Sequence, residues 1–279
     1  MNLVKSIIII SRPLNCIITF VTVLAACYIS SDKPNFNLVF ISAFTGMLVN
    51  AGGNIINDYF DVENDKLNRP DRPLPSGSLT RQTALIVYLF FTAGALFFAY
   101  NINVNAFLIV VVTSVLLFIY SYKLKGVALA GNLVVAFLTG LAFFFGSIAV
   151  GNAFAGIIPA LFAFLISLMR EMVKDIEDIK GDEAIGLSTF PIRFGVNKSV
   201  RFIVVVGIIL IAATIIPYLS GVYNLYYFIF VILSVNVILI NIIVSLKKDV
   251  SETTLKRASK LLKLGMVLGI IAVFIGAKL

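Results

Sequence analysis

Histidine is absent from the 279-residue sequence, and charged residues make up only 13% of it. Without histidine the chain has no imidazole metal ligand, lacks the commonest general base and cannot form a Ser–His–Asp site. A water-soluble domain carries about 25% charged residues, so a chain with so little charge could not cover its own surface in water. The only cysteines, Cys16 and Cys27, fall within one predicted helix and too far apart to form a disulfide. We interpret them as lipid-facing or packed apolar side chains.

Apolar residues, in contrast, make up 60% of the chain, and the mean hydropathy is +1.03. A helix needs roughly 20 apolar residues to cross the hydrocarbon of a bilayer, and it satisfies its own backbone hydrogen bonds there. The sequence therefore predicts an all-α integral membrane protein, with residues 1–279 as a single domain and residues 1–12 as an interfacial lead-in. We predict nine transmembrane helices: Leu14–Ile29, Leu38–Asn57, Thr83–Tyr100, Ala106–Tyr122, Val127–Val150, Phe154–Asp178, Phe202–Leu219, Leu225–Leu246 and Leu261–Ala277.

Charge predicts how these nine helices are oriented. With nine spans, all 22 lysines and arginines except Lys33 and Lys278 fall on the side that holds the N-terminus, as do all 14 acidic residues except Asp32. Because basic residues concentrate on the cytoplasmic side, we predict a cytoplasmic N-terminus and an external C-terminus in the cell membrane. The concentration of both signs of charge on one side also predicts that the chemistry takes place there.

The end of the second predicted span carries a row of carboxylates. Asp58, Asp61 and Asp65 follow one another by three and then four residues, which is the spacing of one helical face. The end of the sixth span repeats this spacing with Asp175, Asp178 and Asp182, beside Arg170 and Lys174.

Like charges at this spacing repel one another on a helix, so each row calls for a compensating cation. Mg²⁺ prefers oxygen ligands and typically takes one or two carboxylates together with phosphate oxygens and water. If the two helix ends faced each other, they could hold Mg²⁺ ions across a shared diphosphate. The alternative is that these are ordinary interfacial charges balanced by nearby lysines and arginines, but the identical spacing of the two rows favours the metal site.

Other polar residues near the same ends of the helices are candidate phosphate or substrate contacts. Arg69 and Arg72 lie in a loop restricted by Pro70, Pro73 and Pro75. The connection after the fourth span supplies Tyr120, Lys123 and Lys125. The remaining candidates are Arg12 and Asn15, where the first span begins, and Asn54 and Asn50, one and two turns deeper than Asp58 on or near its face. Gly52 and Gly53 beside them would allow close helix contact.

These motifs resemble those of the UbiA-type intramembrane prenyltransferases. The resemblance rests on Asn57-Asp58-x-x-Asp61-x-x-x-Asp65 followed by Arg72-Pro73-Leu74-Pro75-Ser76-Gly77, and on Asp175-x-x-Asp178-x-x-x-Asp182. It extends over the whole chain, including the number of spans. It implies a helical bundle around a central cavity, with both aspartate motifs at its cytoplasmic mouth binding Mg²⁺ and a prenyl diphosphate. Within this family, the longer strings around both motifs are most similar to the archaeal enzymes that build the ether-lipid core.

The resemblance implies a reaction in which a geranylgeranyl group passes from its diphosphate to geranylgeranylglyceryl phosphate, a lipid-like acceptor. The diphosphate leaves, an allylic carbocation forms, and the acceptor hydroxyl captures it, so that stabilising the developing charge is the main task. The six aspartates would serve as metal ligands, with Asp58, Asp61, Asp175 and Asp178 counted as catalytic. The residues assigned to phosphate or substrate are Asn57, Arg69, Arg72, Tyr120, Lys123, Lys125, Lys174, Arg12, Asn15 and Asn54.

Two alternatives remain open at this point. The acceptor could be aromatic, such as a hydroxybenzoate or naphthoate, because quinone-forming members of the family share much of the first motif. The chain could instead be a membrane transporter, since ionisable residues in spans are often functional. Transport sites, however, usually lie near the bilayer midplane, whereas the ionisable residues here gather at one end. We expect membrane lipid around the chain, no nucleic-acid partner and no obligate protein partner.

Overall fold

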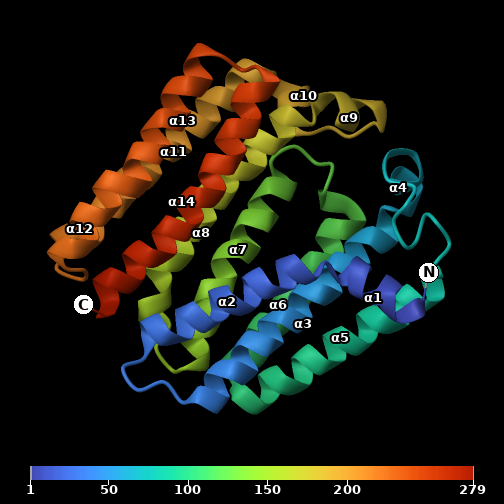
Figure 1. Ribbon diagram of the computed structural model, residues 1–279, viewed down its shortest axis with the longest axis horizontal. Helices are drawn as coiled ribbons and strands as arrows, with labels where there is room; N and C mark the ends of the chain where they lie inside the picture. The colour runs from blue at the N-terminus through green and yellow to red at the C-terminus, as the bar shows by residue number, and fades with distance from the viewer. Residues whose placement is uncertain (1, 279) are drawn as a thin grey trace. The chain divides into compact units, whose positions relative to one another are not determined.

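Residues 2–278 are described by the computed structural model of the chain, and this part of it is helical apart from connecting turns and one isolated bridge between Val127 and Ser188. The elements are α1 (Leu3–Ser11), α2 (Pro13–Ser30), α3 (Phe36–Phe60), α4 (Val62–Asn68), α5 (Arg81–Ile102), α6 (Val104–Ile119), η1 (Tyr120–Leu124), α7 (Ala130–Ala149), α8 (Ala153–Glu177), α9 (Ile179–Ala184), α10 (Phe190–Phe194), α11 (Val196–Leu219), α12 (Leu225–Val231), η2 (Ile232–Asn236), α13 (Val237–Lys248) and α14 (Glu252–Lys278). Figure 1 shows their order along the chain.

Nine helical segments within the described residues are long and apolar enough to cross a membrane, as the sequence predicts. Each predicted span lies on one of them, with α6 and η1 forming the fourth and α12, η2 and α13 together forming the eighth. The largest error is in the ninth, which begins at Glu252 rather than Leu261. An apolar window cannot detect the charged segment Glu252–Lys260, more than two turns long, although glutamate, lysine and arginine are good helix formers. Residues 1–12, predicted as an interfacial lead-in, contain helix α1.

Asparagine and threonine side chains begin several of these helices. Asn35 accepts a hydrogen bond from the backbone N–H of Leu38, Thr80 from that of Thr83, and Asn103 from that of Ala106. Each bond satisfies a backbone donor that has no partner within the helix. These caps fix where the apolar segments start, since composition alone does not.

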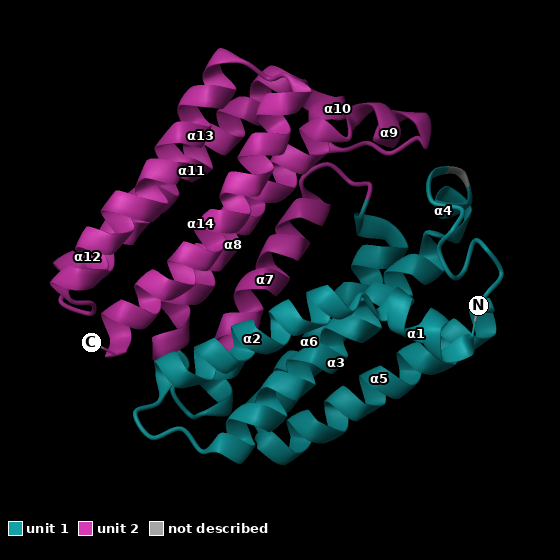
Figure 2. Cartoon of the chain, in the orientation of Figure 1, with its two compact units in different colours: residues 1–125, 145–153 teal, residues 126–144, 154–279 magenta. Residues whose placement is uncertain are grey.

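The chain forms two compact units, coloured separately in Figure 2. The first comprises residues 1–125 and 145–153, and in it α3 packs against both α2 and α5. Helix α3 also packs closely against α6, because residue 53 is glycine: a Cβ atom there would lie 3.0 Å from the side chain of Leu117 on α6. The prediction that glycine allows close helix contact is thus confirmed at Gly53. At Gly52 a Cβ atom would make only an ordinary van der Waals contact with α5, 3.4 Å from Thr92 Oγ1.

The second unit comprises residues 126–144 and 154–279. Within it α14 packs against α12 and α13, and α11 packs against α13. Helices α7 and α8 approach so closely that a side chain at Gly140 would lie 2.6 Å from the carbonyl oxygen of Ala160. Large apolar side chains remain exposed in both units, among them Phe90 at 73% and Leu219 at 75%. Exposure on this scale fits a chain whose outer helical faces contact lipid.

Candidate active site

The first row of aspartates lies where α3 ends and α4 begins. Asp58 is in the last turn of α3, Asp61 joins the two helices, and Asp65 lies in α4. The sequence predicts one continuous helical face, and this is only partly right because the helix breaks at Asp61. The backbone nevertheless keeps its helical hydrogen bonds there, from Asp61 N–H to the carbonyl of Asn57 (3.0 Å) and from Asp65 N–H to that of Asp61 (2.8 Å). All three aspartates are buried, with 4%, 8% and 8% of their surface exposed.

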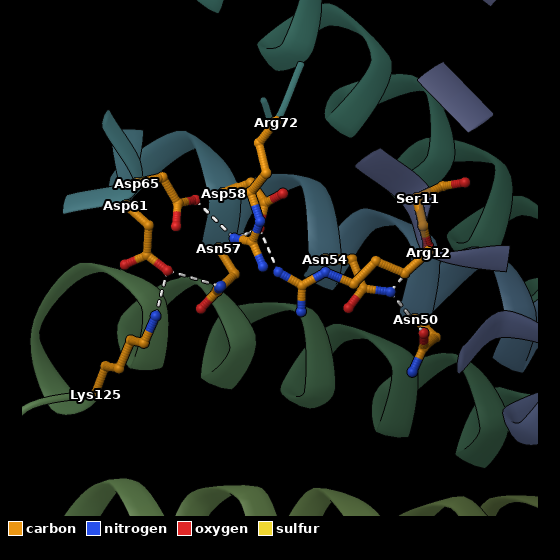
Figure 3. Close-up of polar contacts among 10 residues, drawn as sticks. All are labelled: Ser11, Arg12, Asn50, Asn54, Asn57, Asp58, Asp61, Asp65, Arg72 and Lys125. Atoms are coloured by element: carbon orange, nitrogen blue, oxygen red, sulfur yellow. Dashed lines mark hydrogen bonds and ion pairs between the residues drawn. The ribbon is translucent and has the colours of Figure 1, made fainter. Parts of the chain in front are cut away.

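Three cationic side chains neutralise these three carboxylates (Figure 3). Arg72 bridges two of them, with its Nη1 atom 3.3 Å from Asp58 Oδ1 and 2.7 Å from Asp65 Oδ2. Arg12 forms a second ion pair with Asp58, and Lys125 pairs with Asp61. The amide of Asn57 also donates to Asp61, at 2.9 Å. Burying three like charges would be costly without such partners, so the cluster holds together as a neutral set.

Arg12 reaches Asp58 because the chain breaks sharply between α1 and α2. Its φ and ψ of 52° and 74° place it in the left-handed region, which costs a residue other than glycine roughly 1–2 kcal/mol. Two contacts hold this break: Arg12 N–H donates to the carbonyl of Ile9 (3.1 Å), and the Asn54 amide donates to the carbonyl of Ser11 (2.9 Å). Asn54 itself is tied to Asn50 at 2.9 Å. Asn54, predicted as a substrate contact, thus anchors the segment that carries Arg12.

Arg72 is held by the proline-containing turn that the sequence singled out. Its backbone N–H donates to the carbonyl of Arg69 at 3.1 Å, and the N–H of Leu79 donates to that of Pro73 at 2.9 Å. Leu74 and Leu79 from this turn are buried in an apolar cluster with residues of α1, α3 and α5. The loop is thus docked, and Arg72 emerges from a fixed position.

The structure distinguishes the two lysines after the fourth span. Lys125 pairs with Asp61, whereas Lys123 is exposed and its ammonium lies 5.3 Å from the ring centroid of Tyr122. The last turn of this span is a π-helix, and Lys125 N–H donates to the carbonyl of Tyr120 at 3.0 Å. Such a turn displaces the following residues from their ordinary helical positions, which is why spacing alone could not select the lysine that contacts the cluster.

The second row of aspartates lies where α8 ends and α9 begins, in the second unit. Asp175 is in α8, Asp178 joins the two helices and Asp182 is in α9, so this row repeats the break seen in the first. Asp175 and Asp182 are half-buried and Asp178 is exposed. The Asp175 carboxylate accepts a hydrogen bond from the amide of Asn132 on α7 at 2.9 Å.

Glu171 organises the cations beside this second row. Its two carboxylate oxygens lie 2.9 Å from Arg170 Nη1 and 3.5 Å from Lys174 Nζ. Neither Glu171 nor Asn132 was predicted as a site residue. A signal was present for Asn132, because it is an amide within a predicted membrane span, where polar groups need partners.

Two of the predicted substrate contacts stand apart from the carboxylates. Arg69 and Asn15 are exposed, and within the described part of the chain neither side chain forms an ion pair or hydrogen bond with the first row. Tyr120 is half-buried. Glu63, part of the first motif's string, lies on the surface and pairs with Lys66 at 2.9 Å, which lowers the pKa of that carboxyl.

The donor sets fit a metal that takes few protein ligands. Among residues 2–278 no group of three or more acidic, cysteine or histidine side chains lies close enough to enclose a metal ion. Each row does offer carboxylate oxygens at a helix end beside cations that suit phosphate. Mg²⁺ is commonly bound in this way, through one or two carboxylates with substrate phosphate and water supplying the remaining oxygens.

Comparison with known proteins defines the class. Residues 18–274 match the UbiA prenyltransferase family, so the chain belongs to that family and is a multi-pass membrane prenyltransferase. The resemblance drawn from the two motifs is confirmed, and the transporter alternative is excluded.

Among members of the family, the chain is similar to digeranylgeranylglyceryl phosphate synthases. It is 38% identical to the enzyme of Thermococcus sibiricus, with 98% of this chain and 97% of that one covered. It is also 38% identical to the Methanopyrus kandleri enzyme, with coverage of 94% and 96%.

Solved structures agree with this placement. The fold matches a structure of digeranylgeranylglyceryl phosphate synthase with a TM-score of 0.88 at 30% identity, covering 98% of both chains. A UbiA homolog from Archaeoglobus fulgidus bound to GPP and Mg²⁺ matches with a TM-score of 0.70 at 16% identity, covering 96% and 99% of the two chains. The second comparison shows a shared fold alone.

Proposed function

We propose that this prenyltransferase transfers a geranylgeranyl group from geranylgeranyl diphosphate to geranylgeranylglyceryl phosphate, with Mg²⁺, and so forms the archaeal ether-lipid core. The names of its relatives support this acceptor. Prenyl diphosphate as donor is supported by the Archaeoglobus homologs bound to GPP or DMAPP with Mg²⁺.

The observation that carries the proposal is the neutral cluster at the end of α3. Asp58, Asp61 and Asp65 are buried carboxylates, and Arg72 and Lys125 supply cations of the kind that bind phosphate. Both kinds of group are needed wherever a metal and an anionic leaving group are held together. When bound, Mg²⁺ would neutralise charge on the diphosphate and favour its departure.

The second row would contribute in the same way. We propose Asp175, Asp178 and Asp182 as further metal ligands and Lys174 as a phosphate contact, with Asn132 holding the Asp175 carboxylate in position. Further proposed contacts with phosphate or substrate, direct or through a neighbouring residue, are Asn57, Arg12, Arg69, Asn15, Asn54, Tyr120 and Lys123.

Chemistry of this kind suits a chain without histidine. Once the diphosphate departs, the acceptor hydroxyl attacks an electron-poor allylic carbon and needs little prior activation. The proton can pass to a carboxylate or to the departing diphosphate. The abundant phenylalanine (24 residues) provides apolar surface for prenyl tails.

We further propose that the site faces the cytoplasm in the cell membrane. The support is the charge distribution described above. Two exposed serines can test it, Ser76 before α5 and Ser220 after α11, because the native Cys16 and Cys27 are buried. In intact cells an impermeant maleimide should label Ser220→Cys, and it should label Ser76→Cys only after the membrane is opened. The reverse pattern would contradict the orientation.

An acceptor competition tests the proposed function. Purified protein would receive geranylgeranyl diphosphate and Mg²⁺ with equal amounts of geranylgeranylglyceryl phosphate and 4-hydroxybenzoate, and the products would be identified by mass. We expect digeranylgeranylglyceryl phosphate as the product. A prenylated benzoate as the dominant product would keep the reaction type and overturn the proposed acceptor.

A further inference from the structure

The cations of the first cluster are more exposed than the carboxylates that they neutralise. The side chains of Arg12 and Lys125 are 32% and 37% exposed, whereas those of their partners Asp58 and Asp61 are 6% and 11% exposed. Figure 3 shows Arg12, Arg72 and Lys125 approaching from three separate segments of the first unit. One oxygen of each carboxylate, Asp58 Oδ1, Asp61 Oδ2 and Asp65 Oδ2, is already paired with a protein cation. A metal that binds one of these oxygens must compete with that cation.

Arg12 differs from Arg72 in how it is attached to the cluster. Arg72 contacts two carboxylates and makes its shorter contact, 2.7 Å, with Asp65. Among the described residues, Arg12 forms an ion pair with Asp58 alone, through the same Oδ1 atom that Arg72 contacts. If Asp58 acquires a new cationic partner, Arg12 loses its only carboxylate, while Arg72 keeps Asp65.

The backbone holds Arg12 close to the cluster even when its side chain is free. The left-handed break at Arg12 is fixed by two hydrogen bonds, from Arg12 N–H to the Ile9 carbonyl and from the Asn54 amide to the Ser11 carbonyl. The ring of Pro13 also fixes the backbone angle φ of the residue that follows Arg12. None of these contacts involves the guanidinium. The side chain can therefore move from one anion to another without any change in its anchor.

We propose that Arg12 is a removable counterion of Asp58. When a divalent cation binds Asp58, the Arg12 side chain leaves that carboxylate and pairs its guanidinium with the diphosphate. The inference rests on the proposed function and deepens it. A second positive charge at Asp58 repels the guanidinium, and a diphosphate offers Arg12 the bidentate oxygen geometry that suits it. Metal and diphosphate then assist each other: the diphosphate receives the arginine that the metal displaces, and such coupling is reciprocal.

The exchange predicts effects of opposite sign from one substitution. In Arg12→Gln, nothing competes with the metal at Asp58 except Arg72, so Mn²⁺ alone should bind about tenfold more tightly than in the wild type, within the usual range of coupling between sites. At saturating Mn²⁺, inorganic pyrophosphate should bind the variant about tenfold more weakly, because its arginine partner is lost. Free Mn²⁺ can be counted by electron paramagnetic resonance and pyrophosphate binding followed by calorimetry, both on the full chain in detergent.

Matched variants separate this exchange from other effects. Lys5→Gln removes the same charge from an exposed position on α1 and should leave both affinities unchanged. Arg12→Lys keeps the charge, so Mn²⁺ alone should bind as in the wild type. Pyrophosphate should bind more weakly, because lysine lacks the planar guanidinium that donates two hydrogen bonds at once. This second variant keeps the test available if Arg12→Gln does not yield folded protein.

Three results would overturn the inference: equal Mn²⁺ affinity in Arg12→Gln and the wild type, weaker binding of both ligands in Arg12→Gln, or an equal gain in Lys5→Gln. Should one of these three results be obtained while the wild type binds Mn²⁺ and pyrophosphate and Asp58→Asn loses that binding, the proposed metal site stands and the exchange alone falls. If the wild type binds neither ligand, both proposals fall.

Discussion

Removal of Arg72 should destabilise the protein markedly, because two buried carboxylates depend on it. Asp58 and Asp65 are 4% and 8% exposed, and Arg72 bridges them at 3.3 and 2.7 Å. Loss of one partner of a buried ion pair costs about 3–5 kcal/mol. Asp58 would keep Arg12, and the Arg72 side chain is itself 21% exposed, so we expect Arg72→Ala to lower the free energy of unfolding by about 3 kcal/mol, the lower end of that range.

Unfolding by SDS in mixed micelles would measure this loss, with Arg69→Ala as the matched control. Arg69 lies on the surface of the same loop, so its removal should change stability by no more than about 0.5 kcal/mol. In the double variant Arg72→Ala/Asp65→Asn the stranded charge is removed, and at least about 1 kcal/mol of the loss should be recovered. Equal stability losses in Arg72→Ala and Arg69→Ala, or no recovery in the double variant, would show that Arg72 does not compensate the buried charges of Asp58 and Asp65.

Lys125→Ala should lower turnover at least about tenfold more than Lys123→Ala, because only Lys125 pairs with Asp61; equal losses in steady-state assays would contradict this. Asn132→Ala should raise the Mg²⁺ concentration needed for half-maximal turnover by about 10–100-fold, the usual cost of losing a group that orients a metal ligand; an unchanged Mg²⁺ titration would argue against that role. Gly140→Ala should destabilise by about 1–3 kcal/mol, since its new carbon would meet a carbonyl oxygen at 2.6 Å. Gly269→Ala on α14 has open space and should be tolerated, so similar melting of the two variants would count against the packing described for α7 and α8.

The class of protein and the position of every span could be predicted from the sequence, because transmembrane helices depend on local composition and length. The ends of the helices could be predicted less well. The segment Glu252–Lys260 continues α14 although it is rich in charge, and the breaks at Asp61 and Asp178 divide what the spacing suggested were single faces.

Within the site, the aspartates could be predicted but most of their partners could not. Arg12 and Asp58 are 46 positions apart, and Lys125 and Asp61 are 64 apart, so their pairing depends on how helices pack rather than on any local pattern. The π-turn before Lys125 could not be detected from spacing either. Asn132 was missed because a single amide in an apolar stretch indicates a need for a partner without identifying it.

We propose that both aspartate rows hold the metal and diphosphate of a prenyl transfer to geranylgeranylglyceryl phosphate. The most direct measurement is product formation from geranylgeranyl diphosphate and this acceptor, by wild type, Asp58→Ala and Asp178→Ala, with Mg²⁺ or with EDTA. We expect digeranylgeranylglyceryl phosphate only from the wild type and only with Mg²⁺, while both variants stay monodisperse in detergent. Normal turnover by either folded variant, or by the wild type in EDTA, would contradict a role for these aspartates and Mg²⁺ in the reaction.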